Sequence, residues 1–218
     1  GENFYLRPDS LNPVKLWIHD YDQNGSIEKI MTYTVEGRDM PVFLKRDMED
    51  QLPSIKKSNL KNEEYAKRSI QELFPPEVLD KAKVKQFNYP VSCAAINKGN
   101  GQFEIRPLPP MMQLSCINVF RVLDIEGDGD MDLLAGGNQF GFLPQFERLD
   151  ASLGDVLIND GKGNFSWQES AKTGLTLRGE MRDIQAIKGR SGTYYLFLQN
   201  DQYPILYERK KKGAFIQP

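Results

Sequence analysis

Histidine and cysteine are scarce in this sequence of 218 residues. His19 is the only histidine, so a Ser-His-Asp or Cys-His catalytic arrangement would have to use it. It lies beside an acidic segment, with no nucleophile motif around it, and we interpret it as a structural neighbour of that segment. The two cysteines, Cys93 and Cys116, show no CxxC or Cys/His spacing. Two buried free thiols and a cross-strand disulfide both stay open, and the free thiols are favoured.

Long apolar runs and basic stretches are missing as well. No segment approaches the length of a membrane span, so no membrane-spanning helix is expected. The formal net charge is −2, and no long basic stretch alternates with aromatic residues. Nucleic-acid binding therefore has no support in the sequence. The chain begins with Gly rather than Met and shows no signal peptide, which predicts a processed or truncated chain.

The sequence does contain a dense acidic segment, residues 124–132, in which every second side chain is a carboxylate. Like charges this close repel one another, and Ca²⁺ removes that penalty because it takes about six to eight oxygen ligands from a flexible loop. Glycines at positions 127 and 129 allow the tight backbone turn that such a loop needs. The flanking residues are β-prone, so the loop is expected to join two strands. The acidic residues are Asp124, Glu126, Asp128, Asp130 and Asp132.

Residues 20–28 have the same design. Oxygen-bearing side chains again occupy positions 1, 3, 5, 7 and 9, a glycine occupies position 6, and alternating β-prone segments flank the loop. Two loops with matching spacing and flanks are more typical of metal ligand sets than of solvated turns. The candidate ligands are Asp20, Asp22, Asn24, Ser26 and Glu28.

Neither loop is an EF-hand. That motif needs a bidentate Glu at position 12 and a helix on each side. Position 12 is Met31 in the first loop and Ala135 in the second. We therefore expect calcium loops between strands rather than between helices.

A helical stretch from about 45 to 85 interrupts this β-rich sequence, with one apolar stripe at helical spacing that we interpret as core packing. Two β-hairpins with glycine-rich turns, at 94–106 and 156–167, repeat one plan almost residue for residue. The acidic loops (Asp20 and Asp124) are 104 residues apart, and the hairpin turns (Gly99 and Gly161) are 62 apart. The difference between these two separations nearly equals the length of the helical stretch. This predicts a repeat whose first copy carries an insertion.

The predicted fold is mainly β, with about three blade-like units and a helical insertion. The units are residues 14–108, with the insertion at 45–85, then 113–170 and 178–210. In the third, degraded unit Asp183 takes the place of Asp124 and no metal is expected. Residues 1–218 would form a single β-propeller-like domain or the C-terminal fragment of a longer, partial propeller. Because a propeller has about four to eight blades, the open edges need the insertion, further blades or a second copy to cover them.

Residues 124–134 and 157–165 together resemble the FG-GAP/VCBS repeats of bacterial extracytoplasmic β-propellers, including the ASPIC/UnbV-associated type. In that family each repeat is one four-stranded blade, and the acidic loop binds Ca²⁺ through side chains at positions 1, 3, 5 and 9 and a backbone carbonyl at position 7. The resemblance implies a Ca²⁺ site in each loop, formed by the ten candidate ligands, and a location in the periplasm or at the cell surface. Glu126 and Glu28 depart from it, because shorter Asp or Asn side chains are usual there.

The function expected is a non-enzymatic, calcium-stabilised module for binding or adhesion, with a protein or a carbohydrate as ligand. Segment 137–152, which carries three phenylalanines, is either the binding segment or a connection that packs its own aromatic rings. One alternative is a protein-interaction scaffold that docks a partner through the helical insertion. Another is a carboxylate-dependent hydrolase, which needs two acids at a suitable separation.

Overall fold

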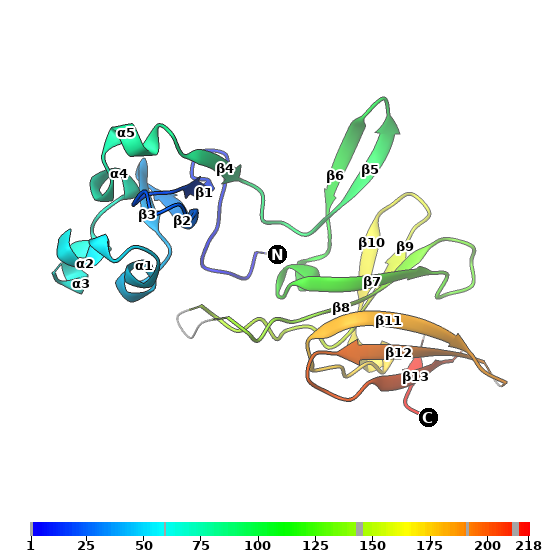
Figure 1. The fold of residues 1–218 in the computed structure, drawn as a ribbon. Helices are drawn as coiled ribbons and strands as arrows, with labels where there is room; N and C mark the ends of the chain where they lie inside the picture. Colours follow the sequence, from blue (N-terminus) through cyan, green and yellow to red (C-terminus); the bar gives the residue numbers. More distant parts are fainter. Residues whose placement is uncertain (1, 59, 143–145, 191, 211–213) are drawn as a thin grey trace. The chain divides into compact units, whose positions relative to one another are not determined.

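The computed structural model describes residues 2–58, 60–142, 146–190, 192–210 and 214–218. The protein is mainly β, with 39% of its residues in strands and 15% in helices, which confirms the predicted class. The chain divides into two compact units (Figure 1). The N-terminal unit is Tyr5–Pro90, and the C-terminal unit is Val91–Pro218 together with the first four residues. Each unit carries one acidic loop.

An antiparallel sheet in the order β3-β2-β1-β4 forms the centre of the N-terminal unit. The first acidic loop joins its two middle strands, and His19 pairs with Glu28 at the base of the loop. The sheet is complete at four strands because the chain turns back after β2 to form β3, and returns after the helices to form β4. The strands are β1 (Val14–His19), β2 (Glu28–Val35), β3 (Arg38–Pro41) and β4 (Lys83–Phe87).

In the described part of the chain, five short helices lie between β3 and β4. The helical character predicted for residues 45–85 is therefore confirmed for most of that stretch. Their apolar side chains are buried against the sheet, so that Met48, Leu52 and Ile70 form one core with Trp17 and Ile30. This burial confirms the core interpretation of the helical stripe. The helices are α1 (Lys45–Gln51), α2 (Ser54–Ser58), α3 (Asn62–Ala66), α4 (Ile70–Leu73) and α5 (Pro76–Leu79).

The insertion ends earlier than the predicted residue 85. Residues 83–87 are extended and pair with β1, because Val84 alternates inward to the core while Lys83 and Lys85 face solvent. The apolar stripe is also divided between two helices, α3 and α4. Ser69 and Glu72 form a capping box that starts the second helix.

The C-terminal unit contains one two-stranded hairpin and two four-stranded antiparallel sheets, each a meander in chain order. The order is β10-β9-β8-β7 in one sheet and β11-β12-β13-β14 in the other. The hairpin is β5 (Cys93–Gly99) and β6 (Gln102–Pro107), followed by the 3-10 turn η1 (Pro110–Gln113). The first sheet is β7 (Ile117–Leu123), β8 (Asp132–Gly137), β9 (Asp155–Asn159) and β10 (Phe165–Gln168). After α6 (Ser170–Thr173), the second is β11 (Met181–Lys188), β12 (Thr193–Gln199), β13 (Ile205–Arg209) and β14 (Phe215–Ile216).

The two four-stranded sheets pack face to face through the main core of the C-terminal unit. Leu134 and Val156 from one sheet meet Ile184, Phe197 and Tyr207 from the other. The opposite face of the first sheet has its own smaller core, which includes Ala135, Leu157 and Met112. The first sheet is therefore apolar on both faces, as expected for a sheet stacked between neighbours.

Residues 14–108 do not form one blade-like sheet. The hairpin at 93–107 belongs to the C-terminal unit, and its strands pair with each other alone in the described part of the chain. The physical reason is that β3 and β4 already occupy the edges of the first sheet. The predicted units at 113–170 and 178–210 each correspond to a four-stranded sheet, the second extended to 216 by β14. None of these sheets is closed, and no helix among the described residues is long and apolar enough to cross a membrane.

Candidate metal centres in the two acidic loops

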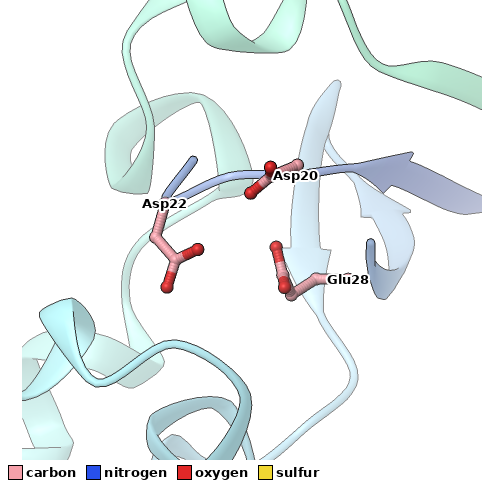
Figure 2. A group of neighbouring side chains, drawn as sticks. All are labelled: Asp20, Asp22 and Glu28. Carbon is pink, nitrogen blue, oxygen red and sulfur yellow. The ribbon is translucent and has the colours of Figure 1, made fainter. Parts of the chain in front are cut away.

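Three carboxylates of the first loop converge on one point. Asp20, Asp22 and Glu28 each offer an oxygen, and these oxygens all lie within 4.8 Å of one another. Figure 2 shows Asp20 and Asp22 reaching in from the loop after β1, and Glu28 from the start of β2. Glu28 is buried while Asp22 is exposed, so the group opens from the protein towards solvent. Such a set of hard oxygen donors suits Ca²⁺ or a similar hard cation.

Backbone N–H groups hold the first loop in shape. The N–H of Tyr21 donates to Oε2 of Glu28 at 2.9 Å, and the N–H of Gly25 donates to Oδ2 of Asp20 at 2.9 Å. The N–H of Ser26 donates to Oδ1 of Asn24 at 2.7 Å. Asn24 and Ser26 are thus part of the loop frame, and their side chains are exposed.

The second loop uses the same frame at the same positions. Ile125 donates to Oδ2 of Asp132 at 2.8 Å, Gly129 to Oδ2 of Asp124 at 3.1 Å, and Asp130 to Oδ1 of Asp128 at 3.0 Å. The backbone also matches, because positions 4 and 6 have positive φ in both loops (Gln23 59° and Gly25 90°; Gly127 85° and Gly129 96°). The register is equal too, with Leu123 pairing with Asp132 as His19 pairs with Glu28. The matching spacing in the sequence therefore corresponds to a matching structure.

The second loop differs in where its carboxylates point. Within the described residues, no three acidic groups of 124–132 meet the mutual distance that the first loop satisfies. The carboxylate of Asp130 lies against Gly161 on the turn between β9 and β10. A guanidinium, that of Arg209, donates to the backbone carbonyl of Asp124. A cation supplied by the chain itself thus reduces the repulsion that a metal would otherwise have to remove.

Three residues that were not among the predicted ligands contact the loops or lie within them. Asn159 donates its N–H to Oδ1 of Asp132 at 2.8 Å and its side-chain amide to the carbonyl of Met131 at 3.0 Å, so it joins the second loop to β9. Arg209 comes from a strand far along the chain. Tyr21 is buried in the core next to Phe74, and burial together with the charge of Glu28 raises the pKa of its phenol. Long-range pairing brings Asn159 and Arg209 to the second loop, which no local spacing could reveal, whereas Tyr21 lies inside the first loop at position 2.

The third predicted copy of the loop is differently placed. Asp183 is the third residue of β11, near the start of the strand, and does not occupy the start of a loop. The turn between β11 and β12 spans residues 189–192, of which the structure describes all but 191. This short turn occupies the position that the acidic loop has in the preceding sheet. The alignment of Asp183 with Asp124 was therefore wrong by most of a strand.

Segment 137–152 is an arm that extends β8 and β9. Gln139 and Leu149 form an antiparallel bridge across it. The guanidinium of Arg148 lies 3.7 Å from the ring centroid of Phe140, and Phe142 packs on Phe4 with centroids 5.8 Å apart. Phe140 therefore packs within the segment, whereas Phe142 packs on a ring outside it, and the choice between a binding segment and a self-packed connection stays a prediction. Residues 143–145 lie outside the described part of the chain.

Comparisons with known proteins give no independent identification. No protein family, curated protein or solved structure matched the chain. The likeness to FG-GAP/VCBS repeats stays an interpretation of the two loops and the two hairpin turns.

Proposed function

We propose that this protein is a non-enzymatic binding module whose β-sheets are stabilised by Ca²⁺ bound in the two acidic loops. The observation that carries the proposal is the convergence of Asp20, Asp22 and Glu28 in a loop whose frame of hydrogen bonds recurs around Asp124–Asp132. The ion would be structural, because it would cross-link the two ends of a strand-to-strand loop and cancel carboxylate repulsion. Calcium suits an exposed, flexible loop better than Mg²⁺, which demands a near-ideal octahedral site.

The sheets support a module of the β-propeller type. Two four-stranded antiparallel meanders follow one another in the chain and pack face to face, which is how successive blades meet. The ligand class we propose is a protein or a carbohydrate. The location we propose is the periplasm or the cell surface, where abundant calcium would keep weak sites of this kind filled.

The test is thermal unfolding of the full chain in millimolar Ca²⁺ and in EGTA. An ion that binds only the folded protein adds about 2.7 kcal/mol at a hundredfold excess over its dissociation constant, which is about 10 °C or more for a unit of this size. Asp22→Ala should remove most of the rise in the N-terminal unit, because it deletes one converging carboxylate from an exposed position. Asp50→Ala is the matched control, since Asp50 is exposed on α1 of the same unit. Equal melting temperatures in Ca²⁺ and EGTA would contradict the proposal.

A further inference from the structure

The hairpin β5–β6 has the same structure as the hairpin β9–β10. Ala95 pairs with Ile105 as Leu157 pairs with Trp167, and Asn97 pairs with Phe103 as Asn159 pairs with Phe165. The side chain of each Asn accepts a backbone N–H of its turn, but from different positions: Asn97 from Gly99, two residues on, at 2.8 Å, and Asn159 from Gly163, four residues on, at 3.0 Å. The repeat seen in the sequence is therefore also a repeat of register.

The two hairpins differ at one strand edge. The edge of β9 away from β10 is paired with β8, through contacts such as Leu133 with Leu157. The equivalent edge of β5 has no strand beside it in the part of the chain that the structure describes. A lone two-stranded hairpin is marginal in water, and a free strand edge exposes unpaired N–H and C=O groups.

The same contrast holds for the apolar face. Leu157 is fully buried in the smaller core of the first sheet, and Phe165 and Trp167 pack there too. Their counterparts on the hairpin are exposed: Phe103 has an exposed fraction of 57% and Ile105 of 49%. The strand edge and the apolar face are thus covered in the hairpin β9–β10 and uncovered in the hairpin β5–β6.

The hairpin is nevertheless anchored to the rest of the C-terminal unit at and near its base. At its base, the buried amide of Gln113 accepts the N–H of Ser92 at 2.8 Å and donates to the carbonyls of Ser92 and Leu108. Further out, the guanidinium of Arg106 donates to the carbonyl of Lys162 at 2.5 Å. Such pre-organisation lowers the ordering cost of binding.

We propose that the free edge of β5 binds an extended segment of a partner chain, added antiparallel as a third strand in the way that β8 is added to β9. The chemistry of β8 defines that segment. It begins with a carboxylate, because Asp132 accepts the N–H of Asn159, and Asn97 is the equivalent residue on β5. Apolar side chains follow at alternate positions, as Leu133 and Ala135 do, and cover the face of Phe103 and Ile105. This site goes beyond the metal loops and does not need calcium.

The probe is a fluorescent peptide of residues 130–138 of this chain, with two lysines added at its C-terminus for solubility. Its anisotropy is measured during titration with the full protein, in Ca²⁺ and again in EGTA. Saturable binding is expected in both. A scrambled peptide should not bind, and Asp132→Ala in the peptide should weaken binding by about tenfold, the loss of one charge-assisted hydrogen bond.

The location is tested with a double variant of the protein, Phe103→Lys with Ile105→Lys, which should weaken peptide binding by at least about tenfold. The matched control, Ile187→Lys with Tyr203→Lys, adds the same charge at exposed apolar residues of β11 and of the connection between β12 and β13, and should bind as the wild type does. Hydrogen exchange should show that the peptide protects the amides of 93–99. Absence of saturable peptide binding would overturn the proposal. So would peptide binding to the double variant that equals binding to the wild type, with the amides of 117–123 or 155–159 protected from exchange. Because the readout is the same in EGTA, its failure is distinguishable from failure of the calcium sites.

Discussion

The backbone N–H of Tyr21 donates to Oε2 of Glu28 at 2.9 Å and closes the first acidic loop. Ile125 and Asp132 repeat this contact at 2.8 Å in the second loop. Asp132 uses its other oxygen to accept the N–H of Asn159. For Glu28, the N–H of Tyr21 is the donor found among the described residues. The carboxylate at position 9 therefore holds the loop in both copies, and in the first it also keeps an oxygen for a cation.

Replacing Asp132 with Ala should destabilise the C-terminal unit by about 2–4 kcal/mol even in the absence of calcium. The reason is that the buried carboxylate accepts two backbone N–H groups, and both would lose their acceptor. Urea unfolding in EGTA measures the change. The control is Glu126→Ala in the same loop, where the exposed side chain should matter by about 0.5 kcal/mol or less. Equal losses from both variants would contradict the structural role of Asp132.

Glu28→Gln should separate the two roles of position 9 in the first loop. The amide oxygen still accepts the N–H of Tyr21, but the charge that repels Asp20 and attracts a cation is gone. We expect the melting temperature in EGTA to be unchanged or higher, and the rise in Ca²⁺ to be largely lost. Glu36→Gln, on the turn between β2 and β3, is the control for a charge change in the same unit. A full calcium response in Glu28→Gln would exclude Glu28 as a ligand.

Gly137→Ala should disrupt the end of β8. A Cβ atom at Gly137 would lie 1.8 Å from the backbone carbonyl oxygen of Cys116, and backbone atoms cannot move aside as a flexible side chain can. Overpacking of this kind costs about 1–3 kcal/mol, and a backbone clash belongs at the upper end. Gly141→Ala is the control, because its nearest neighbour, Nε2 of Gln139, is at an ordinary 3.6 Å. Chemical denaturation of both variants compares the two, and similar stabilities would show that the close approach is not present in solution.

Asp155 should give the C-terminal unit a stability that falls as pH rises. Burial raises the pKa of this carboxyl, against hydrogen bonds from Ser152 and Trp167 that lower it. A folded-state pKa above the unfolded value means that the favourable contribution is fully present below the unfolded pKa, and is lost as pH rises through the folded pKa. The free energy of unfolding of Asp155→Asn, measured against pH, should lack this component. The difference in free energy of unfolding between wild type and variant should therefore change with pH across that window and be constant above it. A difference that is constant at every pH would contradict the raised pKa.

The sequence predicted the parts of the fold that depend on local chemistry. Spacing of oxygen ligands and glycines located both acidic loops, and the glycine turns located both hairpins. Burial of the helical stripe followed from its period. Each of these features is set by residues within about one turn or one strand of one another.

The errors came from pairings between distant strands. The local sequence of Lys83–Phe87 does not indicate that this segment pairs with β1, so the sequence places it within the predicted helical insertion. The short strand Arg38–Pro41 was likewise missed, and together these two strands displaced the hairpin from the first sheet. The contacts of Asn159 and Arg209 with the second loop were invisible for the same reason. The sequence also could not predict that the carboxylates approach one another more closely in the first loop than in the second, because the two loops have the same spacing of ligands.

Calcium titration of the full chain by isothermal calorimetry, with Mg²⁺ as comparison, tests the central claim most directly. The proposed function predicts two Ca²⁺ per chain, with weaker or no binding of Mg²⁺. Asp22→Ala should remove one ion and Asp128→Ala the other. Loss of one ion in each variant would establish both loops as sites. No calcium binding in the wild type, or binding that both variants retain in full, would contradict the account.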